Sequence, residues 1–129
     1  MPTVARAFAT AYAEHDAADG GDRSYADAGK RAARLAVGEL ATDLGQKRPG
    51  QEAPWAALRA HQTKQTVKVT SVEVPDGAPA PTPSTAFVRV VYVLTSKPKS
   101  GASERRSEQL ALRLVHTKFG WRVAELPWA

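Results

Sequence analysis

The stretch SEQLALRLVHTKFGWRVAEL, residues 107–126, decides the fold. Leucines at positions 110, 112 and 114 alternate with polar or small residues, which is the period of a strand with one buried face. Lys118-Phe119-Gly120 then predicts a tight turn, and residues 121–126 return as a second strand that ends at Pro127. The stretch therefore predicts an antiparallel β-hairpin near the C-terminal end.

Two further strands precede this hairpin. Valines at 67 and 69 share one parity and valines at 72 and 74 share the other, which predicts a bulge at Thr70-Ser71. Residues 86–95 are apolar on both faces apart from Arg89. A proline-rich segment, residues 75–85, and a basic segment, residues 97–106, connect the strands as extended and flexible loops. We expect a four-stranded meander.

The first sixty residues carry helical periodicity instead. Residues 3–16 place Val4, Phe8, Ala11, Tyr12 and His15 on one face. A capping-box pattern at residues 24–27 predicts a second helix that runs to Leu44-Gly45. Residues 55–61, after Pro54, predict a short third helix with Trp55 and Leu58 facing inward. Helices followed by a meander indicate an α+β domain, in which N-terminal helices pack on a curved, antiparallel, four-stranded sheet.

Composition limits what this chain can do. It has 129 residues, which fits one domain, and no cysteine, which excludes disulfides and thiol chemistry. No apolar run approaches the roughly 18 residues that span a bilayer, and the N-terminus lacks a signal-peptide pattern. The net charge is +5, with −3 on residues 1–29 and +8 on residues 30–129. Because the basic residues are scattered, a solubilising surface is favoured over a nucleic-acid site.

Few residues indicate chemistry. The three histidines, His15, His61 and His116, lack metal-ligand spacing, so we expect no metal and no cofactor. The strand carboxylates Glu73, Glu108 and Glu125 are expected to face solvent. No nucleophile motif or phosphate-binding glycine loop is present in the sequence. Phe87 and Tyr92 have opposite parity, so they form no single stacking surface, and sequence-specific nucleic-acid binding is not expected.

The strand at residues 86–95 yields a candidate interface. Val88, Val90, Tyr92 and Leu94 share one parity without a charge and are assigned to the core. The other parity is the candidate contact surface for another subunit or a second copy, because an exposed apolar patch usually marks an interface. We call it the outer strip; it consists of Phe87, Arg89, Val91 and Val93. We expect Arg89 to lie on a water-facing or interface face, where its stem covers its neighbours. The alternative is that it binds an anionic ligand in the concavity of the sheet.

The order of elements and three motifs resemble the nuclear-transport-factor-2-like superfamily, whose fold is a cystatin-like cone. The motifs are Ala7-Phe8-Ala9-Thr10-Ala11-Tyr12-Ala13, Trp55-Ala56-Ala57-Leu58 and Gly120-Trp121-Arg122-Val123-Ala124-Glu125-Leu126. The alanine- and arginine-rich sequence looks like an actinobacterial protein. Within the superfamily it is most similar to extracytoplasmic domains of membrane-anchored conjugative-element proteins, relatives of a type IV secretion assembly factor.

This resemblance implies one domain over residues 1–129, the extramembrane part of a longer protein whose anchor precedes Met1. It implies a non-catalytic scaffold on the extracytoplasmic side of the cell envelope, which binds other subunits of a DNA-transfer channel or itself. It implies contact with the membrane only through the anchor. A cytoplasmic location is the alternative.

The same cone also hosts isomerases, dehydratases and cyclases, so the alternative function is ligand binding or catalysis. Its candidate residues are Tyr12, His15 and Asp16, with Tyr92 or His116 facing them from the sheet. We expect Phe8, Trp55 and leucine side chains to close the mouth of the cone. A polar cavity of roughly 300 Å³ or more would instead favour the enzyme alternative.

Overall fold

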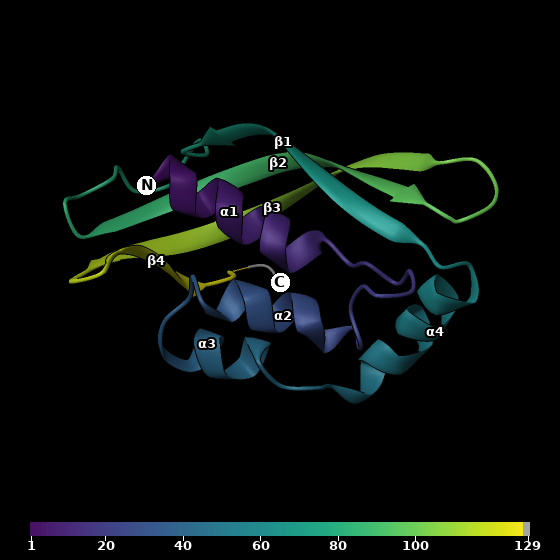
Figure 1. The fold of residues 1–129 in the computed structure, drawn as a ribbon. Helices are drawn as coiled ribbons and strands as arrows, with labels where there is room; N and C mark the ends of the chain where they lie inside the picture. Colours follow the sequence, from purple (N-terminus) through teal and green to yellow (C-terminus); the bar gives the residue numbers. More distant parts are fainter. Residues whose placement is uncertain (128–129) are drawn as a thin grey trace.

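The computed structural model describes residues 1–127 and confirms the α+β class. Four helices and one 3-10 turn precede a single antiparallel sheet of order β1-β2-β3-β4 (Figure 1). The elements are α1 (Pro2–Ala13), α2 (Ala26–Ala33), α3 (Gly38–Leu44), η1 (Pro49–Gln51), α4 (Glu52–Ala60), β1 (Lys64–Glu73), β2 (Thr85–Lys97), β3 (Glu104–Thr117) and β4 (Gly120–Glu125).

The strand predictions hold closely. The register of β1 against β2 shifts between Val69 and Ser71, which confirms the predicted bulge. β2 alternates between buried and partly exposed residues along most of its length, so its two faces have different environments. The connection after β2 is shorter than predicted, since the two strands extend to Lys97 and from Glu104.

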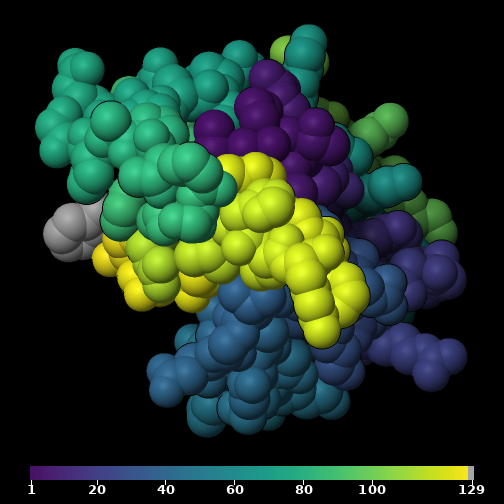
Figure 2. All heavy atoms as spheres, turned by 90° about the vertical axis from the view of Figure 1, so that its left-hand side faces the viewer, coloured from purple at the N-terminus to yellow at the C-terminus, as the bar shows by residue number. Residues whose placement is uncertain are grey.

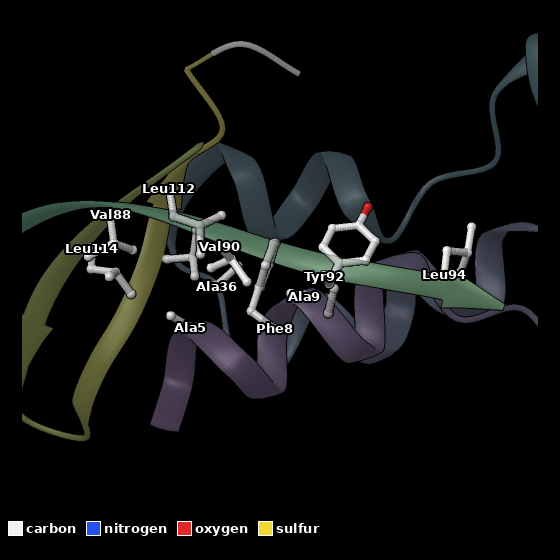
Figure 3. Close-up of a cluster of buried hydrophobic side chains, with 12 residues drawn as sticks. Ala5, Phe8, Ala9, Ala36, Val88, Val90, Tyr92, Leu94, Leu112 and Leu114 are labelled. Carbon is white, nitrogen blue, oxygen red and sulfur yellow. The ribbon is translucent and has the colours of Figure 1, made fainter. Parts of the chain in front are cut away.

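The core lies between α1 and the inner face of the sheet, which we define as the face that the helices cover. Ala5, Phe8 and Ala9 of α1 are fully buried against inner-face residues of the strands (Figure 3). These inner-face residues are Val88, Val90, Tyr92, Leu94, Leu112, Leu114 and Val123, as the parity predicted for β2 and β3 requires. Small alanines on the helix let its backbone lie close to the larger strand side chains.

The predicted second helix is wrong in its length, because it is broken into α2 and α3. Residues 34–37 leave the helix and run beside β4. The Val37 N–H donates to the Val123 carbonyl at 3.0 Å, and the Val123 N–H donates to the Leu35 carbonyl at 2.8 Å. These two bonds satisfy both backbone groups of Val123 on the free edge of β4, and they replace helical bonds that local periodicity had favoured.

The predicted first helix is also too long, because α1 ends at Ala13. Residues 14–17 are extended and pair with the start of β1. The Gln65 N–H donates to the His15 carbonyl at 2.8 Å, the Ala17 N–H to the Thr63 carbonyl at 2.9 Å, and the Val67 N–H to the Glu14 carboxylate at 2.8 Å. This segment covers the first part of the free edge of β1.

The other helices and the loops lie around the sheet and α1. The α2–α3 segment lies below the sheet, and α4 lies beside the start of β1 (Figure 1). Seen from the end that carries the β3–β4 turn, the β1–β2 loop and the turn lie above the α2–α3 segment (Figure 2). None of the helices within residues 1–127 is long and apolar enough to cross a membrane.

Candidate functional site

A cavity of about 350 Å³ lies between the helices and one end of the inner face of the sheet. Its walls come from the end of α1, from α2 and α3, and from inner-face residues of β1, β2 and β3. The expectation that Phe8 and Trp55 close this space is wrong. Phe8 is fully buried in the core, where its ring stacks on Tyr12. Neither Phe8 nor Trp55 lines the cavity.

Only some of the candidate residues line the cavity. Tyr12 and His15 line the cavity, and Tyr92 faces them from β2 as predicted. Asp16 does not line it: the carboxylate of Asp16 accepts the Ala18 N–H at 3.1 Å inside the loop that follows α1. His116 lies at the far end of β3, where its ring packs edge-on against Trp121. The predicted trio is therefore not assembled.

His15 is buried within a defined hydrogen-bond chain. Its Nδ1 lies 3.0 Å from Gln65 Oε1 and 3.2 Å from the Ala13 carbonyl, and its ring stacks on Tyr25 at 4.0 Å. The Gln65 amide nitrogen donates to Ser96 Oγ at 3.2 Å. Because a backbone carbonyl only accepts hydrogen bonds, the contact with Ala13 places a proton on Nδ1. Burial lowers the pKa of His15 below its ordinary value, despite these hydrogen bonds.

The sheet side of the cavity carries a polar group of three residues. The Tyr92 hydroxyl donates to Glu108 at 3.2 Å, and Arg106 pairs with the same carboxylate at 2.6 Å. Burial, followed by the charge and hydrogen bond of Glu108, raises the pKa of Tyr92 well above its ordinary value. Glu108 was expected in solvent and is instead half-buried on the inner face, which corrects that prediction. Glu108 and Leu110 have the same parity in β3, so the alternation of apolar and polar residues in this strand already predicts that Glu108 faces inward.

Several lining residues had not been singled out. Tyr25, Gln65 and Arg106 all face the cavity. Burial raises the pKa of Tyr25 as well. The cavity thus combines three tyrosines, one buried imidazole and one ion pair with apolar walls from α3 and β2. Such a lining can hold a small ligand through hydrogen bonds, but its strongest polar groups already bond to one another.

The outer strip lies on the other face of the sheet. Phe87, Arg89, Val91 and Val93 are all partly exposed, whereas their neighbours Val88, Val90, Tyr92 and Leu94 are buried. Arg89 pairs with Glu73 of β1 at 2.6 Å, which supports the interpretation that it lies on an open face and covers its neighbours. The other two strand carboxylates that were expected in solvent, Glu73 and Glu125, are exposed there.

No group of three or more histidine, aspartate or glutamate side chains among residues 1–127 is arranged to hold a metal ion. The cavity also contains no glycine-rich cradle for a phosphate-bearing cofactor, since Gly29 is its only glycine within the described part of the chain. The prediction that the protein uses neither metal nor cofactor stays a prediction.

No protein-family model matches the sequence, and no curated protein sequence matches it. A solved structure, the crystal structure of the intermembrane space region of the chloroplast protein ARC6, is similar with a TM-score of 0.41 and 12% identity. The likeness covers 71% of this chain and 70% of that chain. At this level it carries no argument about function.

Proposed function

We propose that the chain is a protein-binding domain that docks its partner on the outer strip. One observation carries the proposal: no element within residues 1–127 packs on this face, although Phe87, Val91 and Val93 form a row of apolar side chains along it. An antiparallel sheet with one solvated face normally alternates apolar and polar residues. A row of apolar side chains left partly exposed is typical of an interface.

The edges of the sheet favour docking by side chains over strand addition. Residues 35–37 bond to β4, and residues 14–17 bond to the start of β1. Blocked edges cannot accept a further strand at these positions, because their backbone groups already have partners. A partner is therefore expected to contact the face of the sheet.

The sequence resemblance supplies the setting of this proposal. In this setting, the domain is a non-catalytic scaffold of a conjugative DNA-transfer assembly that is similar to type IV secretion systems. The domain lies at the cell envelope, on the extracytoplasmic side of the membrane. Its partners are other subunits of that assembly, or a second copy. Its link to the membrane is a segment outside residues 1–129. What supports the setting is the three sequence motifs.

Site-specific photocross-linking tests the docking surface. A photoreactive phenylalanine analogue replaces Val91 in one variant and Phe119, which is 73% exposed in the β3–β4 turn, in a matched control. We expect a discrete cross-linked protein from position 91 and none from position 119. The identified protein, purified, should bind the unmodified chain and lose binding to Val91→Glu, whose melting temperature stays near that of the wild type. No adduct at position 91 would contradict the proposal.

A second candidate function is small-molecule binding, and the 350 Å³ cavity favours it. The cavity exceeds the size set above for the enzyme alternative, and Tyr12, His15 and Tyr92 line it. The third candidate residue, Asp16, is outside, and Glu108 is already neutralised by Arg106. These contacts support holding a neutral, hydrogen-bonding ligand more than proton transfer to it.

A fragment screen followed by NMR separates this candidate from the first. Small phenols and amides that enter the cavity should shift the amide signals of Gly29 and Gln65. Ala13→Trp narrows the cavity from α1 and should abolish these shifts, while Ala7→Trp, at an exposed position of the same helix, should not. Shifts that survive Ala13→Trp would exclude the cavity as the binding site.

A further inference from the structure

Four basic side chains gather on the outer face at one end of the sheet. The register pairs Lys64 with Lys97, Lys68 with Val93, and Arg105 with Thr95. Directly paired residues of an antiparallel ladder project to the same face, and Val93 marks that face as the outer one. We call Lys64, Lys68, Lys97 and Arg105 the basic corner. It lies at the end where β1 and β3 begin and β2 ends (Figure 1).

No carboxylate within residues 1–127 is paired with the basic corner, since none of its four side chains forms a salt bridge there. Asp16 is paired with Lys64 across an isolated bridge, but its carboxylate accepts the Ala18 N–H. The other end of the face differs, because Arg89 pairs with Glu73 and Arg113 pairs with Glu125.

This arrangement slightly destabilises the isolated fold. Lys64 and Lys97 stand directly opposite each other, and like charges at such positions destabilise a sheet. All four basic-corner residues are exposed, so the cost is modest in water. The face therefore presents unpaired cations that continue into the apolar side chains of Val93 and Val91.

We infer that the partner of the outer strip is a protein segment that carries carboxylates followed by aliphatic side chains. This inference rests on the proposed docking function and specifies the chemistry of its partner. Carboxylates would meet the basic corner, and aliphatic side chains would meet Val91 and Val93. Complementary charge of this kind sets the orientation and the rate of association.

Other occupants fit this surface less well. A second copy placed face to face would bring the basic corner against its own equivalent or against the paired end, where Glu73 and Glu125 already bond to arginines of their own chain. A single-stranded nucleic acid gains much of its affinity from bases stacked on aromatic side chains, and the apolar residues next to the basic corner are valines. A duplex binds cations through its phosphates but leaves the apolar side chains of Val91 and Val93 without a partner. A membrane would need apolar side chains that protrude, and Val91 and Val93 are only partly exposed.

Peptide selection on the complete chain tests the inference. Peptides selected from a random library should be rich in aspartate or glutamate next to valine, leucine or isoleucine. Lys97→Glu combined with Arg105→Glu should weaken a selected peptide about tenfold or more, because like charges then meet. The matched control, Lys47→Glu with Arg23→Glu, makes the same charge change at exposed positions outside the sheet and should leave affinity within about twofold.

The outcomes distinguish this inference from the proposed function. Binding that is lost in Val91→Glu but unchanged in the Lys97/Arg105 variant keeps the docking function and overturns the acidic partner. A dimer in sedimentation that Val91→Glu dissociates has the same consequence. Stronger binding to phosphatidylglycerol vesicles or to a short DNA duplex than to the peptides, lost in the Lys97/Arg105 variant, also overturns the inference.

Discussion

Adjacent valines on β2 provide a stringent test of how the sheet divides the molecule. Val90 is 0% exposed within the core, and Val91 is partly exposed on the outer strip. Threonine has nearly the shape of valine and a similar strand propensity, so Val→Thr creates no cavity and changes only polarity. A hydroxyl buried without a partner costs about 1–3 kcal/mol, whereas a surface substitution stays within about 0.5 kcal/mol.

The free energy of unfolding of Val90→Thr should therefore fall by about 1–3 kcal/mol, and that of Val91→Thr should hardly change. For a domain of this size, the first change corresponds to a drop in melting temperature of roughly 4–12 °C. Urea unfolding, monitored by circular dichroism, measures the free energy of unfolding of both variants. As a control, the dependence of this free energy on urea concentration should have the same slope in both variants, which indicates an unchanged unfolded state. Equal losses in the two variants would refute the division into a covered and an uncovered face.

Two further predictions concern the helices. Gly29→Ala should destabilise the fold by about 1–3 kcal/mol, because its new methyl group would collide with the Leu44 carbonyl, although alanine is the better helix former. Gly45→Ala, whose methyl group would meet nothing closer than 3.7 Å, is the matched control in thermal melts. Because burial lowers the pKa of His15, the unfolded chain takes up its proton first, and stability should fall as the pH drops from about 7 towards 5. His15→Gln should remove this component in urea unfolding at each pH, and an unchanged pH profile would contradict it.

The strands could be predicted because a period of two reports which face is buried. The leucines at 110, 112 and 114 and the split between Val90 and Val91 follow directly from alternation. The same alternation places Glu108 inside, and the expectation that carboxylates face solvent overrode it. The bulge at residues 70–71 was predictable because it leaves a change of phase in the sequence.

The helix ends could not be predicted, because long-range backbone bonds decide them. The break after Ala33 exists because residues 35–37 bond to β4, and α1 stops at Ala13 because residues 14–17 bond to the start of β1. Neither partner is local in sequence, so helical periodicity continues through both breaks. His15 was consequently assigned to a helix face, and it lies in an extended segment instead.

The cavity depends on the same breaks. Tyr25 precedes α2, Leu40 and Leu44 belong to α3, and their positions around the cavity follow from where each helix stops. Sequence spacing predicted that Tyr12, His15 and Asp16 lie together. Tyr12 and His15 do line the cavity, whereas the Asp16 carboxylate bonds within the loop that follows α1 and does not line it. A cavity whose walls come from three helices and three strands leaves no periodic pattern from which it could be predicted.

NMR mapping of a selected acidic peptide on the complete chain tests the central claim most directly. If the outer face of the sheet is the docking surface, the amide signals that move should belong to Lys68, Val91, Val93 and Ser107, which the register places side by side on β1, β2 and β3. Signals that move instead at Tyr12, His15 and Gly29, around the cavity, would contradict the account.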